Sequence, residues 1–300
     1  MAVLLTVLAG GSWLSLDFSL ARVPAFTDYA GRPNESGGTN WLLVGSDSRE
    51  GLSAEQERQL NTGDEADAGG ARTDTIMLLH IPSGHTPPSL VSLPRDSLVP
   101  INGHGENKLN AAYGLGGPTL LSRTVQETTG LHIDHYLEIG FGGFAGMVDA
   151  VGGVPVCLVE RVHDPKINLD LAPGCRELDG ADALGYMRTR AFPHGDLERV
   201  EHQRAFLSAL IEKCTSRTIL LNPVKLVPLA QRTLGTTTFT DGDHLQHVIQ
   251  LALALRYAGG GGLMTRTVPV SGSSEVPGVG SVLLWDNEKA PELFAALRYD

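Results

Sequence analysis

The sequence predicts an α/β fold in which helices are layered around one central sheet. Short runs rich in aliphatic and β-branched residues alternate with longer segments whose apolar residues recur at helical spacing. No internal repeat and no second domain boundary interrupts this alternation. Hydrophobic residues make up 42% of the chain and charged residues 19%, which is sufficient for an ordinary globular core.

The individual elements follow from these runs and from the glycines and prolines between them. Strands are expected at Asn40–Val44, Thr75–Ile81, Ser89–Leu93, Tyr136–Ile139, Val154–Val159, Thr265–Val270 and Ser281–Trp285. Helices are expected at Pro118–Thr128, Phe141–Ala150, Gly180–Met187, Leu197–Lys213, Asp243–Tyr257 and from near Asp286 onward. The acidic segment Glu50–Gly70 shows no apolar period and is expected to be a loop or insertion, long enough to act as a lid.

Residues 1–21 are expected to form a signal anchor. Met1–Leu16 carries no charged side chain, and Asp17 interrupts the apolar run. The run is close to the ~18 apolar residues of a spanning helix, and it lacks the basic flank and cleavage site of a signal peptide. A buried N-terminal helix is the alternative. A polar, glycine-rich linker is expected at 22–38, followed by one domain at 39–300 with C-terminal strands and helices at 235–300.

Charge and cysteine content limit the function. The 23 basic and 34 acidic side chains give a net charge of -11, which opposes nucleic-acid binding. An anionic ligand must therefore be held by a few basic groups gathered in one place. In an oxidising compartment Cys157 and Cys175 could form a disulfide, worth about 3 kcal/mol in the chain-entropy model, leaving Cys214 as a thiol. Three reduced cysteines are the alternative, because spacing alone does not decide between them.

One glycine-rich segment imitates a dinucleotide-binding fingerprint. Gly140, Gly142 and Ala145 match GxGxx[GA] between an expected strand and an expected helix, and Glu160 follows about 20 residues later. That fingerprint should open the first βα unit of its domain, and an exported protein meets little NAD. The preferred interpretation is a turn that lets a helix and a strand pack closely.

Charged residues stand at the ends of expected strands, where ligand sites of α/β sheets gather. Asp47 follows the first strand, Asp74 precedes the second, and Arg95 and Asp96 follow the third. Two carboxylates meeting there could hold Mg²⁺ together with substrate phosphates. A cap or a solvated group is the ordinary alternative for each carboxylate taken singly.

Basic residues near two expected helices form a second group. Arg188 and Arg190 can act together only if the preceding helix has ended, because residues two apart do not share a helix face. Arg199 and Gln203 do share a face, which continues into an apolar stripe beginning at Phe206. A polar pocket leading to an apolar floor would suit an amphiphilic phosphate ester. Contacts with a helix dipole or surface ion pairs are the ordinary alternative.

The order of these motifs resembles the LytR-CpsA-Psr family of bacterial cell-wall ligases. The resemblance covers about residues 40–234, through LLVGSDSR, RTDTIML, SLPRD, KLNAAY, TGLHIDHYLEI, GFGGFAGMVDAVGGVPV, LDGADALGYMRTR and GDLERVEHQRAFL. It implies a three-layer α/β/α sandwich around a central mixed sheet, with a hydrophobic cavity for a polyprenyl chain. It also implies a magnesium-dependent phosphotransferase that moves a glycopolymer (teichoic-acid-, capsule- or arabinogalactan-like) from a polyprenyl-pyrophosphate carrier to peptidoglycan and releases polyprenyl phosphate. The catalytic domain would lie outside the cytoplasm, held by a single membrane span.

The resemblance also assigns roles to residues. It implies that Asp47 and Asp74 are linked to Mg²⁺, and that Asp74, Arg95 and Arg199 are catalytic. The expected pyrophosphate-binding residues are Arg72, Arg95, Lys108, Arg188, Arg190, Arg199 and Gln203. Two features depart from the family: His202 stands where an arginine is common, and Glu50–Gly70 separates the two aspartates by more residues than in many relatives. We expect this insertion to loop out.

Two other functions are compatible with the same motifs. A pyrophosphatase would use water in place of the sugar acceptor and would need the same residues. A non-catalytic lipid-pyrophosphate-binding regulator would need the arginines more than the metal, so the presence of both Asp47 and Asp74 argues against it. The expected partners are therefore the carrier-linked glycan, peptidoglycan and membrane lipid.

Overall fold

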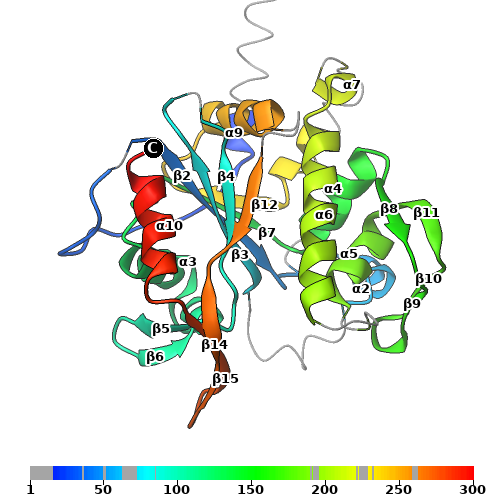
Figure 1. The fold of residues 1–300 in the computed structure, drawn as a ribbon. Coiled ribbons are helices and arrows are strands. Elements are labelled where there is room, and N and C mark those ends of the chain that lie inside the picture. The colour runs from blue at the N-terminus through cyan, green and yellow to red at the C-terminus, as the bar shows by residue number, and fades with distance from the viewer. Residues whose placement is uncertain are drawn as a thin grey trace, which may run out of the picture.

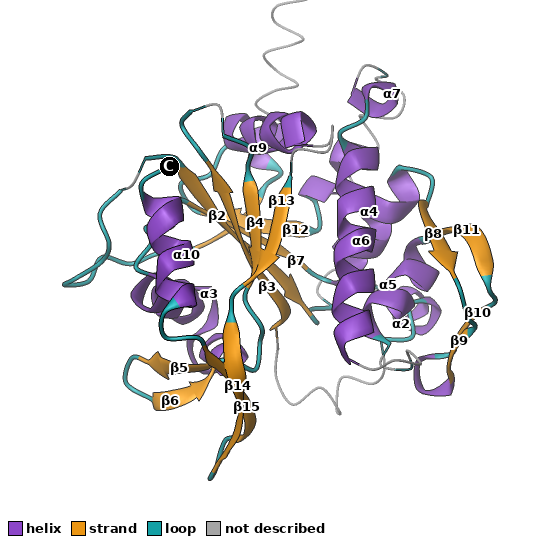
Figure 2. Ribbon diagram, viewed as in Figure 1, coloured by secondary structure: helices purple, strands orange, loops and turns teal. Residues whose placement is uncertain are grey.

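The computed structural model describes residues 16–35, 37–49, 52–62, 73–84, 86–189, 191, 196–220, 222, 229–231, 233–258 and 263–300. Of residues 196–201, 204, 220, 257 and 258 it describes the backbone alone. Within these residues the centre of the molecule is a seven-stranded sheet (Figures 1 and 2). In sheet order its strands are β1 Ala21–Val23, β12 Thr237–Thr240, β7 His135–Ile139, β2 Thr39–Ser46, β3 Thr73–Ile81, β4 Ser89–Ser92 and β13 Met264–Thr267.

The sheet is mixed, as expected. β1 and β12, β2 and β7, and β4 and β13 are parallel pairs. β12 and β7, β2 and β3, and β3 and β4 are antiparallel. Parallel neighbours require crossover connections, and helices supply them on both faces.

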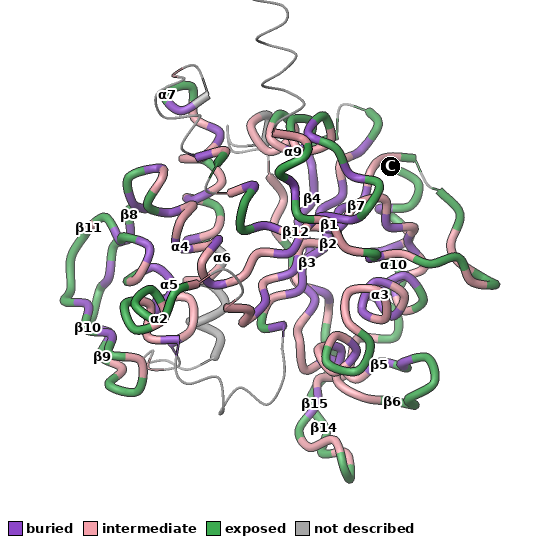
Figure 3. Tube along the Cα trace, turned by 180° about the vertical axis from the view of Figure 1, so that it is seen from behind, coloured by how far each residue is buried: buried purple, intermediate pink, exposed green. Residues whose placement is uncertain are grey.

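The central strands are apolar on both faces, which is why helices cover both. Leu42 and Leu78 belong to a buried cluster shared with α3 (Leu109–Thr129) and α10 (Lys289–Arg298). The alternating residues Trp41 and Leu79 belong to a cluster on the other face, shared with α9 (Leu245–Ala258). Because successive strand residues point to opposite faces, this alternation gives three layers. The predicted α/β/α arrangement is confirmed, and Figure 3 shows buried residues concentrated along these strands.

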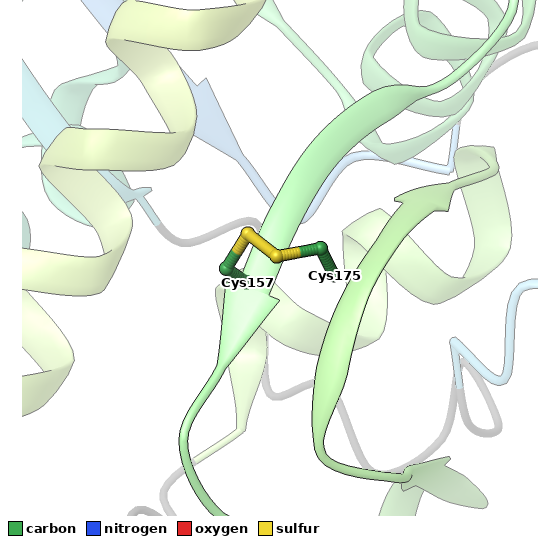
Figure 4. Close-up of a disulfide and its surroundings, with 2 residues drawn as sticks. All are labelled: Cys157 and Cys175. Carbon is green, nitrogen blue, oxygen red and sulfur yellow. A yellow bond between two sulfur atoms is a disulfide. The ribbon is translucent and has the colours of Figure 1, made fainter.

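Beside the sheet lies a second cluster of helices and hairpins with its own core, called here the lateral unit (Figure 1). Its elements are α4 Phe141–Ala150, β8 Val154–Leu158, β9 Val162–Asp164, the 3₁₀ helix Pro165–Ile167, β10 Leu169–Leu171, β11 Gly174–Leu178, α5 Gly180–Arg188, α6 Asp196–Cys214 and α7 Arg217–Leu220. β8 and β11 are antiparallel, with Cys157 opposite Cys175, and the two cysteines form a disulfide (Figure 4). This is the pairing that the spacing allowed. Cys214 is a free thiol.

Several elements differ from the sequence-based expectation. The expected linker 22–38 begins inside the sheet, because β1 pairs with β12. The expected loop Glu50–Gly70 contains a helix, α2 Ala54–Gln59, which starts at a capping box formed by Ser53 and Gln56. The helix expected from Pro118 is confirmed as the second part of α3: non-helical backbone at Gly116 and Gly117 separates it from an additional helical part that begins at Leu109 and was not expected.

The hairpin of β5 Leu98–Ile101 with β6 Gly105–Lys108 was not expected, because four-residue strands carry too few alternations for a period to be read. β15 Gly280–Trp285 confirms the strand expected at Ser281–Trp285, whereas its partner β14 Val270–Val276 was not expected, because its sequence is mostly polar. Among the described residues no helix is both long and apolar enough to span a bilayer.

The glycine-rich segment that imitates a dinucleotide fingerprint is used for close packing. A Cβ on Gly140 would lie 2.8 Å from the Ser48 carbonyl oxygen, and one on Gly143 would lie 2.7 Å from the carbonyl oxygen of Thr236. Both distances are shorter than a real Cβ contact. These glycines let α4 approach the ends of β2 and β12, which supports the packing interpretation.

Candidate functional site

Two acidic residues lie at one end of the sheet, where β2 ends and β3 begins. Ser46 pairs with Thr73 and Gly45 pairs with Thr75, so a β-bulge leaves Asp74 without a partner in β2. Bulges reorient side chains and are common beside functional sites. Asp47 directly follows Ser46, so both carboxylates are placed at the same strand ends. The Asp74 side chain is 47% exposed and therefore accessible to a ligand.

Four charged side chains form a chain of ion pairs from Asp74, through Arg95 and Asp96, to Lys108 just before α3. Arg95 Nη1 donates to Asp74 Oδ1, and Arg95 Nε lies 3.4 Å from Asp96 Oδ2. Lys108 Nζ lies 3.0 Å from Asp96 Oδ1. Burial would raise the pKa of Asp96, but Lys108 and Arg95 outweigh it and the pKa is lowered. Asp96 therefore stays ionised at neutral pH and holds the two cations side by side.

Three hydrogen bonds, from α3 and from β15, hold the turn that carries Arg95. The Asn110 amide donates to the Arg95 carbonyl oxygen at 3.0 Å. The amide of Leu283, in β15, donates to the Asp96 carbonyl oxygen at 2.9 Å. Trp285 Nε1 donates to Ser97 Oγ at 2.8 Å. β15 thus helps to position Arg95, which reduces the entropy lost when Arg95 binds a ligand.

Two more arginines converge on the turn after α2. Arg188 Nη1 donates to the Asn61 carbonyl oxygen at 2.9 Å, and Arg49 Nη2 donates to the Thr62 carbonyl oxygen at 2.7 Å. The Arg188 guanidinium also lies over the Phe141 ring, 4.7 Å from its centroid. The Glu50–Gly70 segment therefore does not simply loop out: its described part packs against these arginines through backbone carbonyls.

Arg188 lies within electrostatic reach of both carboxylates. Burial lowers its pKa, whereas Asp74 and Asp47 act in the opposite direction. A guanidinium remains charged in proteins, so a partly buried cation faces the two aspartates. The helix α5 ends at Arg188, and Thr189 is extended, as the joint use of Arg188 and Arg190 requires.

Arg49 is a site residue that the sequence reasoning did not single out. Its Nε and Nη1 atoms are buried and make no hydrogen bond to any residue that the structure describes. Buried N–H donors without partners are costly, so a ligand oxygen is a natural acceptor for them. The sequence signal that could have found it is its position two residues after Asp47, in the GSDSR segment that follows the strand.

The remaining expected site residues are placed as follows. Gln203 Nε2 donates to the Met187 carbonyl oxygen at 2.7 Å and so ties α6 to the end of α5 beside Arg188. The His202 ring meets Tyr186 edge-on, with centroids 5.9 Å apart. Arg199 lies on α6, in the part where only the backbone is described. Arg72 and Arg190 lie outside the described residues.

The apolar stripe of α6 is partly core. Phe206 is 2% exposed, and its ring lies 5.8 Å from that of Phe144 and 5.9 Å from that of Tyr186. Leu210 is buried in the same cluster. The expected apolar floor is thus occupied on this side by side chains of α4 and α5. Leu207, on the same helix, packs instead toward the α9 face of the sheet.

The arrangement is suited to a ligand with several phosphate oxygens. Arg95, Lys108, Arg188 and Arg49 gather at one end of the sheet of a chain whose net charge is -11. The two carboxylates fit Mg²⁺, because they are hard oxygen donors at adjacent strand ends and Asp74 is half exposed.

Comparison with known proteins finds relatives of this chain. The LytR_cpsA_psr family matches residues 20–297. The chain is 53% identical over 261 residues to the probable cell wall biosynthesis protein LcpB of Corynebacterium glutamicum, covering 87% of this chain and 61% of that protein. The chain thus spans less than two thirds of that relative's length.

Solved structures share the fold. The LytR-Csp2A-Psr enzyme from Actinomyces oris has a TM-score of 0.69 at 23% identity, covering 93% of this chain and 97% of that one. TagT bound to LI-WTA has a TM-score of 0.63 at 23% identity, covering 90% and 92%.

Proposed function

Because the chain belongs to the LytR-CpsA-Psr family, we propose that it is a cell-wall phosphotransferase that moves a glycopolymer from a polyprenyl-pyrophosphate carrier to peptidoglycan. The observation that carries the proposal is the Arg95–Asp74 ion pair at strand ends that Asp47 and Arg188 also face. LcpB carries the name of a probable cell wall biosynthesis protein, and TagT has been solved with LI-WTA bound. A teichoic-acid-like glycopolymer is therefore the first candidate for the transferred group.

The cationic side chains would bind the pyrophosphate. Arg95 and Arg188 are held by carboxylate and carbonyl contacts, and Arg49 has buried N–H groups to offer. Each charge-assisted hydrogen bond to phosphate contributes about 1.5–3 kcal/mol. Because these contacts are preorganised, they would stabilise the charge that develops as the pyrophosphate bond breaks.

The reaction needs one nucleophile and one base. A sugar hydroxyl oxygen of peptidoglycan attacks the phosphorus next to the glycan, and the bond from that phosphorus to the bridging oxygen breaks. Polyprenyl phosphate leaves with the bridging oxygen, and Asp74 accepts the hydroxyl proton. Asp47 and Asp74 would hold Mg²⁺, whose charge would neutralise phosphate oxygens when bound.

The carrier lipid and the location are parts of the same proposal. We place the domain outside the cytoplasm, because the Cys157–Cys175 disulfide belongs in an oxidising compartment. Residues 1–15, which lie outside the described residues, would anchor it beside the membrane that holds the carrier. The expected anchor 1–21 is too long, because Asp17 caps α9 and Ala21 begins β1. An apolar cavity for the polyprenyl chain would contribute about 0.8 kcal/mol per buried CH₂ without reading the glycan.

The test uses the purified full chain with a polyprenyl-pyrophosphate glycan, Mg²⁺ and peptidoglycan fragments, and reads the products by mass spectrometry. Transfer predicts glycan joined to peptidoglycan through phosphate, with polyprenyl phosphate released. Arg95→Ala should lose this product, whereas Arg161→Ala, which removes an exposed ion pair with Asp170, should retain it.

Two other outcomes would replace the proposal. Free glycan phosphate without coupling would identify a pyrophosphatase. Bound lipid without turnover, with and without Mg²⁺, would identify a binding protein.

A further inference from the structure

Two histidines and an aspartate form a compact cluster at the end of the sheet opposite to Asp47. His135 opens β7, in register with Trp41 near the start of β2, whereas Asp47 follows the other end of that strand. Asp243 and His247 lie four residues apart across the start of α9. One potential ligand atom from each of the three lies within 4.8 Å of the others.

The aspartate at the centre of this cluster is nearly inaccessible. Asp243 is 1% exposed, and its Oδ1 meets both His135 Nδ1 and His247 Nδ1, the latter at 3.3 Å. Its Oδ2 is buried and has no hydrogen-bond partner among the residues described. A buried carboxylate oxygen left unsatisfied is costly, and such groups in native proteins are usually paired or bound to a metal.

The charged side chains around the cluster are compatible with a bound cation. The adjacent charged side chains are Asp17, which contacts His244, and Arg22, whose Nε donates to the Asp243 carbonyl oxygen. The carboxylates of Asp17 and Asp243 outnumber the one guanidinium, Arg22, so the net negative charge favours a divalent cation.

The ligands are also held in place. The His135 ring stacks on Trp41 with centroids 4.2 Å apart and lies 4.7 Å from the His247 ring. Trp41 is 1% exposed, so the indole ring is held by the core and fixes the orientation of the His135 ring. Tetrahedral zinc ligands lie roughly 3.3–3.5 Å from one another, which is the His247–Asp243 spacing seen here.

We propose that His135, Asp243 and His247 form a zinc-class binding site, separate from the phosphotransfer site, that joins β7 to the start of α9. Two imidazoles and a carboxylate are a ligand set for Zn²⁺ and related transition metals, whereas Mg²⁺ prefers oxygen ligands alone. The ion replaces the His135–Asp243 hydrogen bond and satisfies the buried carboxylate. It also stabilises the segment around Asp17, which contacts His244 and donates no ligand itself.

The test is metal binding by the purified, tag-free full chain. Isothermal titration with Zn²⁺ should show one site, and Co²⁺ should give d–d absorption bands typical of four or five ligands. Asp243→Asn and His247→Gln should weaken Zn²⁺ binding by more than the roughly 10- to 100-fold that the loss of an outer partner costs. Asp243→Asn preserves shape, and circular dichroism verifies folding of both variants.

Two matched controls separate this site from others. His163→Gln changes an exposed histidine on β9, and Asp74→Asn changes the proposed magnesium site. Both should bind Zn²⁺ as the unmodified chain does, and millimolar Mg²⁺ should not compete. The proposal is overturned by absence of binding at 100-fold excess of metal over protein, by binding that survives both cluster variants, or by binding lost in Asp74→Asn. Because the readout is binding, its result does not depend on whether the transferase activity is found.

Discussion

Arg49 and Arg188 show how single residues of this site are held. Their guanidinium groups donate to the carbonyl oxygens of consecutive residues, Thr62 and Asn61, in the turn after α2. One N–H of each is thereby occupied, while Nε and Nη1 of Arg49 make no bond within the described residues. The turn thus orients the arginines without neutralising them, since a carbonyl oxygen carries no net charge.

We expect Arg49→Lys to lower kcat/KM for glycan transfer by about 10- to 100-fold, because a lysine keeps the charge but loses the planar donor set. The free energy of unfolding should change little. The matched control is Arg161→Lys, which alters an exposed arginine on the lateral unit. Equal activity of Arg49→Lys and the unmodified chain would remove Arg49 from the site.

Cys214 is a second residue with a defined chemical expectation. Burial raises the pKa of its thiol to about 12. Since the thiolate is the reactive form, iodoacetamide at pH 8 should leave the folded chain unlabelled. After unfolding under reduction, mass spectrometry should find three labelled cysteines, and after unfolding without reduction one. Rapid labelling of the folded chain would contradict the raised pKa of this partly buried thiol.

At the scale of elements, α4 and α5 touch because of a glycine. A Cβ on Gly180 would lie 2.5 Å from the Ala145 carbonyl oxygen, and the Gly180 amide donates to Asp149 Oδ1 at 2.7 Å. Gly180 is buried in the first turn of α5. The helices therefore meet backbone to backbone, and Arg188 at the far end of α5 takes its position from this contact.

We expect Gly180→Ala to reduce the free energy of unfolding by about 1–3 kcal/mol, the usual cost of overpacking. Urea unfolding measures this. Gly84→Ala is the control, because nothing lies within 4 Å of a Cβ there. Similar stability of both variants would show that α4 and α5 can move apart at no cost.

The start of α9 is capped by a residue far away in the chain. Asp17 Oδ1 accepts from the Leu245 amide at 2.7 Å, and Asp17 Oδ2 lies 3.1 Å from His244 Nδ1. The Leu245 amide and then His244 lower the pKa of Asp17. A carboxyl whose pKa is lowered in the folded state stabilises that state above its unfolded pKa of about 3.9, and this stability is lost as pH falls through the folded value.

Asp17→Ala should therefore cost about 1 kcal/mol at pH 7, a typical value for a lost helix cap. The difference from the unmodified chain should shrink as the pH falls below about 4. Urea unfolding at several pH values measures it. Asp28→Ala is the control, because the Asp28 side chain is fully exposed in its pair with Arg32. A difference that grows in acid would contradict the sign of the pKa shift.

At the scale of the whole molecule, the N-terminal segment and the C-terminal part of the chain complete one sheet. β1 pairs with β12, whose residues follow it by more than 200 positions, and Ala25 is fully buried against α3 and its neighbours. The β14–β15 hairpin reaches the Arg95 turn from the other end of the sequence. Both termini of the described chain are therefore part of the folded domain.

Comparison of two truncations tests this. A chain lacking residues 1–27 should be less stable than one lacking residues 1–15, because only the first loses β1 and the Asp17 cap. Thermal unfolding by circular dichroism measures the difference. Identical melting curves would show that β1 contributes nothing to the sheet.

The sequence by itself determined the main elements and the layered α/β class. The strand at Asn40–Val44 and the helix at Phe141–Ala150 could be predicted because hydrophobic periodicity and the glycines and prolines that end each element are local properties of the chain. The strand-end positions of Asp47, Asp74 and Arg95 could be inferred for the same reason, and the motif order indicated the family.

Only the tertiary structure decided which of these residues meet, because the partners are distant in sequence. The Arg95–Asp74 pair, the convergence of Arg49 and Arg188 on the α2 turn, and the His135–Asp243–His247 cluster each join elements that no local period connects. β1 and the β5–β6 hairpin were likewise decided by pairing, since strands of three or four residues carry no pattern of their own.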